Sequence, residues 1–225
     1  MKAMILAAGR GERLRPLTDT TPKPLVQVGG HSLIEWHLKH LAESGIKDIV
    51  INISHLASQI RDALGNGQKF NVNIVYSEEP AVALETGGGI FQALTLLGGD
   101  PFVVVNGDIW TDYPFSGLHA PEGLAHLVLV GNPAQHPQGD FVLQNNRVLE
   151  NSHGERYTFS GIGVYRPELF SECKPGRFSL TPVLREAMKN GHVSGEYFAG
   201  HWFDVGAPVR LQHVQDFVSK IQEGS

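Results

Sequence analysis

Two segments that lie far apart in the chain combine residue types that bind phosphate and a divalent metal. The first is Leu6–Pro16 (Leu-Ala-Ala-Gly-Arg-Gly-Glu-Arg-Leu-Arg-Pro), and Lys23 follows it closely. The second, residues 103–108, is a run of valines that ends in Asn-Gly-Asp, with Asp108 as its last residue. Glycines in a loop let backbone N–H groups approach phosphate oxygens, and arginine and lysine neutralise phosphate charge. The two segments therefore predict a site for a nucleoside triphosphate and its metal, and hence an enzyme.

The charge of the first segment differs from that of the whole chain. The chain has 18 Lys and Arg against 23 Asp and Glu, a net charge of −5. This balance argues against nucleic acid or a membrane surface as the partner, because both require a broad basic field. Residues 1–25 instead hold five cations against two acids: Lys2, Arg10, Arg13, Arg15 and Lys23 against Glu12 and Asp19. A simple tight turn needs no such cations, so the segment is interpreted as a focused anion site.

Two other phosphate-binding loops are excluded by their spacing. The dinucleotide fingerprint G-x-G-x-x-G would need a third glycine where this chain has Leu14. It would also need an acid at the end of the second predicted strand, but residues 49–54 contain none. The Walker pattern G-x-x-x-x-G-K-[ST] is absent from the sequence. A dehydrogenase and a P-loop enzyme are therefore both disfavoured.

The motif Leu6-Ala7-Ala8-Gly9-x-Gly11-x-Arg13-Leu14-x-Pro16, followed by Pro22-Lys23-Pro24, resembles the signature of the sugar-1-phosphate nucleotidylyltransferases. These enzymes join a nucleoside triphosphate to a sugar 1-phosphate. The resemblance implies that Arg13 grips the triphosphate and that Lys23 binds phosphate at the reacting centre, so these two are the expected catalytic residues. It also implies nucleotide contacts from Leu6, Ala7, Ala8, Gly9 and Gly11.

Two aspartates are the candidate metal ligands. Asp108 ends an apolar strand, which is where ligands bind in open α/β sheets, although an aspartate after Asn-Gly also suits a plain turn. The resemblance makes Asp108 a nucleotide and metal contact, and it adds Asp204, within Trp202-Phe203-Asp204-Val205-Gly206, as the second metal ligand. Two carboxylates together with phosphate oxygens suit Mg²⁺, which is the expected cofactor.

The chemistry that the resemblance implies needs no strong general base. The attacking sugar phosphate is already anionic at neutral pH, and the difficulty is repulsion between two polyanions. Cations and a metal ion would relieve this repulsion during in-line attack on the α-phosphorus, with pyrophosphate as the leaving group. The motifs contain no histidine, in agreement with this chemistry.

The base and sugar pockets are predicted mainly from the resemblance. Thr86 and Gly87 precede two further glycines at the start of a predicted helix, and the family places this segment against the nucleobase; close packing of the helix is the alternative explanation. Gly139, Glu150 and Ser160 match the sugar-binding positions of the family in order and approximate spacing. Relatives often have asparagine at the last position, and all three residues also suit a hairpin turn or a solvated edge.

Within the family, Glu85–Gly89 and Trp202–Gly206 look most like the members that transfer a uridylyl group from UTP to N-acetylmuramate 1-phosphate in bacterial cell-wall recycling. At 225 residues, the chain is too short to include the β-helix domain of bifunctional acetyltransferases. Guanylyl transfer to mannose 1-phosphate and uridylyl or thymidylyl transfer to glucose 1-phosphate remain alternatives. A lactyl carboxylate on the acceptor would need a cation, for which four arginines are available: Arg147, Arg156, Arg166 and Arg177.

The pattern of apolar residues predicts the fold. Apolar β-like runs at 3–8, 49–53, 72–76, 102–106, 124–130 and 160–165 are interleaved, in the first half, with helical spacing at 32–44, 57–64 and 85–97. This alternation predicts α/β structure, a Rossmann-like three-layer α/β/α sandwich of the nucleotidyltransferase (GT-A-like) kind with a mixed, mostly parallel sheet. Helices are also expected at 181–190 and 208–222. One catalytic domain, 1–225, is expected, with a nucleotide-binding half, 1–108, and an acceptor half, 109–225.

The remaining sequence features indicate the compartment and the partners of the protein. Cys173 is the only cysteine, so no disulfide within the chain is possible, and no apolar run reaches the length of about 18 residues that spans a membrane. We expect a cytoplasmic protein that acts on small molecules and has no nucleic acid or membrane partner; its oligomeric state is open, and a monomer of this size can form its own core. A nucleotide-sugar sensor would share the fold without the chemistry, but Asp108, Asp204 and Lys23 are all present. A purely structural protein would leave the cationic loop unexplained.

Overall fold

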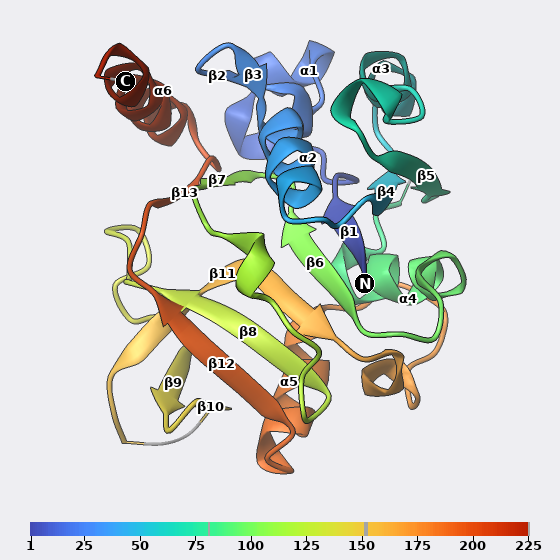
Figure 1. Ribbon diagram of the computed structural model, residues 1–225, viewed down its shortest axis with the longest axis vertical. Helices are drawn as coiled ribbons and strands as arrows, with labels where there is room; N and C mark the ends of the chain where they lie inside the picture. The colour runs from blue at the N-terminus through green and yellow to red at the C-terminus, as the bar shows by residue number, and fades with distance from the viewer. Residues whose placement is uncertain (81, 151–152, 225) are drawn as a thin grey trace.

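The computed structural model describes residues 1–80, 82–150 and 153–224, and its main feature is a mixed nine-stranded sheet (Figure 1). Across the sheet, the strands follow in the order β5 (Asn73–Glu78), β4 (Asp48–Ile53), β1 (Lys2–Leu6), β6 (Phe102–Asn106), β11 (Arg156–Tyr165), β8 (Ala125–Val130), β12 (Val193–Phe198), β10 (Arg147–Leu149) and β9 (Phe141–Gln144). The α/β class and the mixed sheet that the sequence predicts are thus confirmed.

The first four strands of this order are parallel, and the chain changes direction across the sheet at β1. From β1 it proceeds outward to β4 and β5, and it then returns to β6 on the other side of β1. In an open α/β sheet such a reversal leaves a crevice at the carboxyl ends of the strands, and ligands bind there. Leu6 and Asn106 end the two strands that flank this point, and they are register partners.

The first half of the sheet is entirely parallel, and the second half is mainly antiparallel. β11 pairs antiparallel with β6 and with β8, whereas β12 is parallel to β8. β11 begins at Arg156, earlier than the predicted start at residue 160, and its register with β8 shifts between Phe159 and Ile162. This β-bulge interrupts the regular alternation of apolar residues, which explains why the pattern did not show the first part of the strand.

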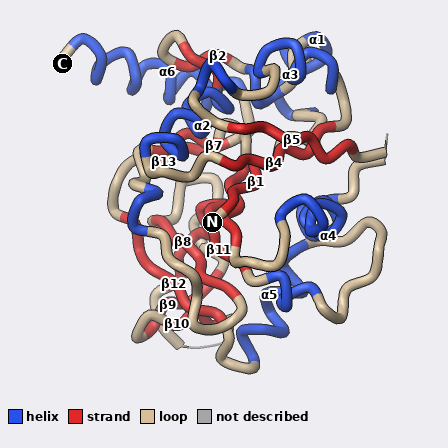
Figure 2. Tube along the Cα trace, turned by 45° about the vertical axis from the view of Figure 1, so that its right-hand side comes forward, coloured by secondary structure: helices blue, strands red, loops and turns tan. Residues whose placement is uncertain are grey.

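Helices cover both faces of the sheet. The covering helices are α2 (Leu33–Glu43) and α3 (Ala57–Leu64) on one face and α4 (Glu85–Leu97) and α5 (Leu180–Lys189) on the other. The two remaining helices, α1 (Leu17–Thr20) and α6 (Pro208–Glu223), lie outside these two clusters. Since neighbouring strand residues face opposite sides, Ile5 packs in the core cluster shared with α2 and α3, and Met4 packs in the one shared with α4 and α5. Figure 2 shows α4 and α5 together on one side of the strands. The predicted sandwich of helices around a central sheet is therefore present.

Helix α2 has the start and the end that its sequence predicts. Ser32 and Glu35 form a capping box, in which the Ser32 N–H donates to the Glu35 carboxylate at 2.8 Å. The helix ends at Glu43, just before Gly45, which has a φ of 80°. Such a φ is easily adopted by glycine alone, so this residue ends the helix where the periodicity stops.

Two small ribbons complete the fold. The hairpin of β2 (Gln27–Val28) and β3 (His31–Ser32) packs with α6 in a third apolar cluster, and β7 (Ile109–Thr111) pairs antiparallel with β13 (Trp202–Asp204).

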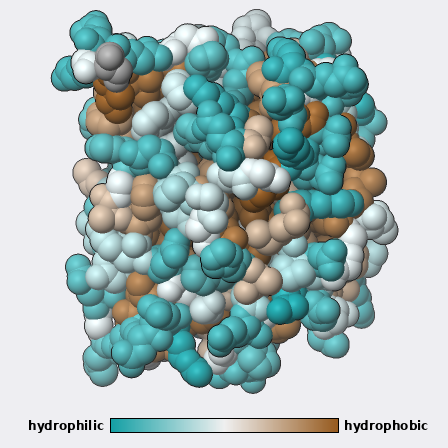
Figure 3. Space-filling model, in the orientation of Figure 1, coloured by the Kyte–Doolittle hydropathy of each residue, from teal (hydrophilic) through white to brown (hydrophobic). Residues whose placement is uncertain are grey.

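The face of the molecule drawn in Figure 3 is mostly hydrophilic, with apolar side chains in small groups. Among the described residues, no helix combines the length and the apolar character that a bilayer span requires.

Candidate active site

A cavity of about 550 Å³ opens at the carboxyl ends of β1, β4 and β6, where the topology predicts a ligand. Most of the predicted nucleotide and catalytic residues line it: Leu6, Ala7, Ala8, Gly9, Gly11, Arg13, Lys23, Thr86 and Asp108. Arg13 and Lys23 thus share one cleft with the carboxylate that ends β6. Such a convergence of cations and a carboxylate in a cavity at the switch point of the sheet is typical of a phosphate-binding active site.

Two glycines beside the cavity, Gly11 and Gly107, are required by the local geometry, whereas a Cβ at Gly9 would meet no atom within 4 Å. Gly11 has a φ of 64°, and a Cβ there would lie 2.9 Å from Cγ2 of Thr18 and 3.1 Å from Cβ of Lys23. The Thr18 hydroxyl donates to the Gly11 carbonyl at 2.8 Å, which holds the loop against the segment that presents Lys23. Gly107 lets β6 approach β1, since a Cβ there would be 2.6 Å from the Leu6 carbonyl oxygen. Side chains at these positions would disrupt the floor of the cavity.

Lys23 is the most buried of the cations in the motif. It is only 7% exposed, and its Nζ lies 2.5 Å from Oδ2 of Asp108. The Asp108 side chain remains 38% exposed, so one side of this ion pair faces the cavity. A cation that is already desolvated interacts more strongly with an incoming phosphate than one in bulk water would.

The two predicted metal ligands come from neighbouring backbone segments. The Asp108 carbonyl accepts a hydrogen bond from the Val205 N–H at 2.9 Å, and Asp204 is the register partner of Ile109. A Cβ at Gly206 would lie 2.8 Å from Oδ1 of Asp204 and 3.1 Å from a terminal nitrogen of Arg13. Gly206 and Arg13 line the cavity, whereas Asp204 is not among the lining residues and lies next to it through its neighbour along the chain, Gly206.

The donor set fits a magnesium ion. Asp204 pairs with Arg210 at 3.1 Å through Oδ2, and Asp108 pairs with Lys23 through Oδ2. Within the described part of the chain, no three His, Cys, Asp or Glu residues are grouped as a ready-made metal cage. Mg²⁺ commonly takes one or two protein carboxylates and completes its shell with water and substrate phosphates. Asp108 and Asp204 are therefore the residues that could hold it.

Two buried polar residues that the sequence analysis missed support the same cavity. Asn52 is 3% exposed and Glu79 is 6% exposed, and both line the cavity. Oδ1 of Asn52 accepts the Ala7 N–H at 2.7 Å, and its Nδ2 donates to Oε1 of Glu79 at 2.6 Å. Oε2 of Glu79 accepts the Leu84 N–H at 3.1 Å. The network ties the start of the glycine loop to the segment that begins α4.

The sequence contains a pattern from which Asn52 and Glu79 could have been identified. Asn52 interrupts the otherwise apolar run Ile49–Ile53, and Glu79 directly follows β5. A polar residue at the carboxyl end of a buried parallel strand is a candidate ligand contact by position alone.

The predicted base-contacting pair separates in the structure. Thr86 is exposed and lines the cavity. Gly87 is buried and is not among the lining residues: a Cβ there would lie 2.5 Å from the Phe178 ring. The Gly88 N–H donates to the Phe178 carbonyl at 3.0 Å. The position of Gly87 therefore agrees with close helix packing, the alternative that its sequence left open.

A second cavity, of about 180 Å³, adjoins the first and shares Thr86 and Asn106 with it. Its other lining residues come from β9, β11, α5 and the segments beside them: Asp140, Phe141, Phe159, Ser179, Leu180, Thr181, Leu184 and Arg185. All of these other lining residues belong to the stretch 109–225, which the sequence analysis expects to be the acceptor half. We refer to it as the acceptor cavity.

The three predicted sugar-binding residues lie near the acceptor cavity but do not line it. Gly139 immediately precedes the lining residue Asp140, and Glu150 pairs with Arg185, another lining residue, at 2.8 Å. Ser160 is 1% exposed, and its hydroxyl donates to the Val128 carbonyl at 2.7 Å and accepts the Ile162 N–H at 3.1 Å. The bulge in β11 turns this hydroxyl into the sheet, and the preceding residue, Phe159, lines the cavity instead.

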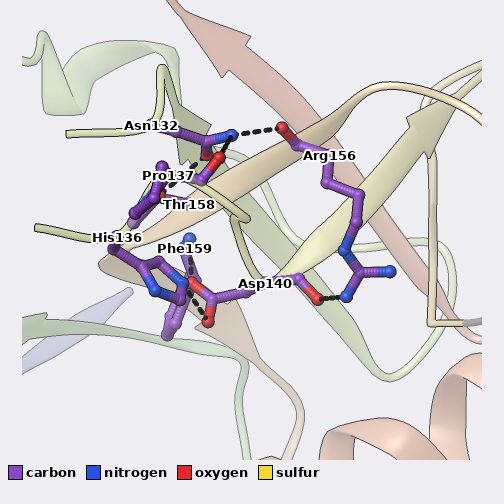
Figure 4. Close-up of polar contacts among 7 residues, drawn as sticks. All are labelled: Asn132, His136, Pro137, Asp140, Arg156, Thr158 and Phe159. Carbon is purple, nitrogen blue, oxygen red and sulfur yellow. Dashed lines mark hydrogen bonds and ion pairs between the residues drawn. The ribbon is translucent and has the colours of Figure 1, made fainter. Parts of the chain in front are cut away.

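The loop that leads to Asp140 is held by the network drawn in Figure 4. Asn132 donates to the Arg156 carbonyl at 2.8 Å, and its Oδ1 accepts the Thr158 hydroxyl at 2.9 Å. Oδ2 of Asp140 accepts the Phe159 N–H at 2.8 Å, and its Oδ1 lies 3.0 Å from Nε2 of His136. Both carboxylate oxygens are thus anchored, which fixes Asp140 at the cavity wall.

His37 is a buried titratable group below the site. It is 1% exposed on α2, and neither ring nitrogen has a hydrogen-bond partner among the described residues. Burial, followed by repulsion from His40, lowers the pKa of His37 to about 4, against smaller opposing effects of the Ile109 backbone and the Asp108 charge. The imidazole is therefore neutral at physiological pH, and it packs in the protein interior.

Acid is expected to destabilise the fold through His37. The unfolded chain binds a proton at this residue below about pH 6.5, whereas the folded chain resists protonation until about pH 4, so the stabilisation present above pH 6.5 is lost as the pH falls through this window. At pH 5 the free energy of unfolding is expected to be lower by roughly 2 kcal/mol for this reason. Urea unfolding at pH 7.5 and pH 5.0 measures it in the native chain, in His37→Leu, and in His119→Gln, an exposed control. An equal loss in native and His37→Leu protein would contradict the assignment.

Comparison with known proteins places these features in a wider context. A family model described as nucleotidyl transferase matches residues 2–141. The chain is 54% identical, over 96% of its length and 97% of the relative, to an N-acetylmuramate alpha-1-phosphate uridylyltransferase of Neisseria meningitidis serogroup B. It is 34% identical to a protein of that same name from Caulobacter vibrioides, over 92% of both chains. A crystal structure from Bacillus anthracis, assigned as a glucose-1-phosphate thymidylyltransferase, matches with a TM-score of 0.86 and 26% identity, covering 97% of this chain and 95% of that one.

Proposed function

The chain belongs to the nucleotidyl transferase family, and from this premise we propose that it transfers a uridylyl group from UTP to N-acetylmuramate 1-phosphate and releases pyrophosphate. The observation on which the proposal rests most is the switch-point cavity, in which Arg13, Lys23 and Asp108 line one cleft. The acceptor cavity adjoins it at Thr86 and Asn106, so two substrates bound side by side would meet near the end of β6.

The reaction is the attack of a sugar-phosphate oxygen on the α-phosphorus of UTP. The new P–O bond forms as the bond to the β-phosphate oxygen breaks, and the electron pair leaves with pyrophosphate. Because the attacking phosphate is anionic at neutral pH, no protein base is needed. The N–H groups of the loop around Gly9 and Gly11 would cradle the triphosphate, Arg13 would hold its outer phosphates, and Lys23 would offset charge at the reacting phosphate.

We propose that Asp108 and Asp204 hold Mg²⁺ when the nucleotide binds. Bound there, the ion would neutralise part of the charge on the triphosphate and polarise the reacting phosphate. The two aspartates are drawn together by the β7–β13 ribbon and by the bond from the Val205 N–H to the Asp108 carbonyl. Their distance from each other along the sequence therefore does not weaken the assignment.

The substrate contacts follow from the two cavities. Thr86 would contact the nucleobase, with Asn52 and Glu79 fixing the segment that presents it. On the acceptor side, Asp140 and Phe159 would contact the sugar. Gly139 permits the turn that presents Asp140, since its φ is 61° and a Cβ there would lie 2.7 Å from Oδ1 of Asn132. Glu150 would act at the rim beside Arg185.

The choice of UTP and N-acetylmuramate 1-phosphate is supported by the names of the two relatives reported above. A place in peptidoglycan recycling in the cytoplasm would follow from that substrate pair, since nucleotide sugars for the cell wall are made from cytoplasmic UTP. The single cysteine of the chain agrees with a reducing compartment.

The proposal is tested by a matrix of nucleotides and acceptors. UTP, GTP, dTTP, ATP and CTP are each combined with the 1-phosphates of N-acetylmuramate, N-acetylglucosamine, mannose and glucose, and pyrophosphate release is measured in Mg²⁺. We expect the highest kcat/KM for UTP with N-acetylmuramate 1-phosphate. A higher value for another pair would assign that pair instead. Tight nucleotide-sugar binding without pyrophosphate release for any pair would indicate a sensor.

A further inference from the structure

The acceptor proposed above has a feature that distinguishes it from ordinary hexose phosphates. N-acetylmuramate is N-acetylglucosamine with a lactyl ether on O3, so it adds a carboxylate two ring carbons away from the phosphate on C1. The acceptor cavity already contains Asp140, and Glu150 stands beside it. Two protein carboxylates would repel a third, so the cavity must supply a cation if it is to bind this sugar.

None of the four arginines that the sequence offered for this role lines the acceptor cavity among the described residues. Arg156 donates to the Glu150 and Asp140 carbonyls, and Arg166 donates to the Pro121 and Gly123 carbonyls. Arg177 pairs with Glu85 at 2.8 Å. Arg147 is exposed on β10, the strand between β12 and β9. Arg156, Arg166 and Arg177 already bond to other groups of the chain, and Arg147 lies outside the cavity.

We propose that Arg185 recognises the carboxylate of the acceptor sugar and thereby determines specificity for it. Arg185 is the one cation among the described residues that line the acceptor cavity, and it projects from the second turn of α5, a rigid element. Its Nε lies 2.8 Å from Oε1 of Glu150, and its side chain is 50% exposed. The inference rests on the proposed function, because it names how that same site selects its substrate.

The ion pair with Glu150 orients the Arg185 guanidinium for binding a carboxylate. Glu150, with a 21% exposed side chain, is more enclosed than Arg185, so it can fix the position of Nε of this cavity-lining residue. Guanidinium has five N–H donors in a planar fork that matches a carboxylate, and one contact at Nε leaves the terminal groups available. Lysine, with a single ammonium group, could not hold Glu150 and a substrate carboxylate with the same geometry.

The test compares two acceptors that differ only in the lactyl group. Native protein, Arg185→Gln and Arg185→Lys are assayed with UTP and either N-acetylmuramate 1-phosphate or N-acetylglucosamine 1-phosphate. We expect Arg185→Gln to lower kcat/KM for N-acetylmuramate 1-phosphate by about 10- to 100-fold, mainly through KM, and to leave the other acceptor within about 3-fold. Arg185→Lys should restore part of the loss. Lys189→Gln, which removes an exposed cation from the same helix, is the matched control.

The outcomes separate the possible roles of Arg185. Equal losses for both acceptors would overturn the proposal, because Arg185 would then act by holding Glu150 or the fold. Unchanged selectivity in Arg185→Gln would also overturn it. As a second measurement, the methyl ester of the lactyl group should be a poorer acceptor than the free acid for native protein but not for Arg185→Gln. Failure of the proposed function would appear differently, as native protein that does not use N-acetylmuramate 1-phosphate with UTP at all, and it would remove this inference as well.

Discussion

Replacing Asp108 or Asp204 by asparagine is expected to reduce kcat by about three orders of magnitude in saturating Mg²⁺. Each change removes one negative charge from the pair of carboxylates at the edge of the nucleotide cavity and keeps the size of the side chain. Asparagine at position 108 can still accept a hydrogen bond from Lys23, so the buried lysine is not left without a partner. The expected loss therefore reports on metal and phosphate binding, with little contribution from unfolding.

The measurement is the rate of pyrophosphate release as a function of Mg²⁺ concentration, accompanied by melting temperatures. We expect the Mg²⁺ concentration at half-maximal rate to rise in both variants, while the melting temperatures stay close to that of the native protein. Asp216→Ala, which removes an exposed acid on α6, is the control for a general change of charge. Near-native rates in either asparagine variant would reject that residue as a metal ligand.

The sequence could predict the nucleotide side of the site because its parts are local. The glycine loop, Arg13 and Lys23 lie within a short stretch, and Asp108 directly follows an apolar strand. A strand followed by glycines and cations has few structural explanations, so residue type and spacing predicted an anion site. The resemblance to the nucleotidylyltransferase signature then supplied the expected roles of Arg13 and Lys23. The same reasoning predicted α2, α3 and α4 to within a residue or so of their bounds, because each is an amphipathic helix between clear stop signals.

The acceptor side could not be predicted in the same way. Its wall is formed by residues from β9, β11 and α5, which the fold brings together from distant parts of the chain. Arg185 looks like an ordinary surface residue on its helix, and only the packing of α5 against the sheet places it at a cavity. Ser160 shows the opposite case: its spacing matched a sugar contact, but the bulge in β11 buries its hydroxyl against Val128. Order along the chain cannot reveal which way a bulged residue points.

Replacing Lys23 by methionine is expected to reduce kcat/KM for UTP by about 100- to 1,000-fold with only a small change in stability. Methionine is similar in length and can fill the space of the lysine stem, which is almost completely buried. Asp108 would lose its partner, but its side chain is 38% exposed and can be hydrated. The lost rate would then reflect a missing phosphate contact, since neither a cavity nor a buried unpaired charge has been created. Lys69→Met, at an exposed ion pair with Glu35, is the matched control. A large fall in melting temperature with a near-native rate would instead assign Lys23 a structural role.

A double-mutant cycle separates two ways in which Lys23 could act. If Lys23 only positions the Asp108 carboxylate, then removing it from the Asp108→Asn variant should cause no further loss, because the carboxylate it positions is already gone. If Lys23 also binds the reacting phosphate directly, Lys23→Met should lower the rate of the Asp108→Asn variant by about 10-fold or more. We expect the second result, because Lys23 is buried and lines the cavity, so that it would place a desolvated positive charge where negative charge accumulates during transfer. An additional loss of less than about 2-fold would restrict Lys23 to orienting the metal ligand.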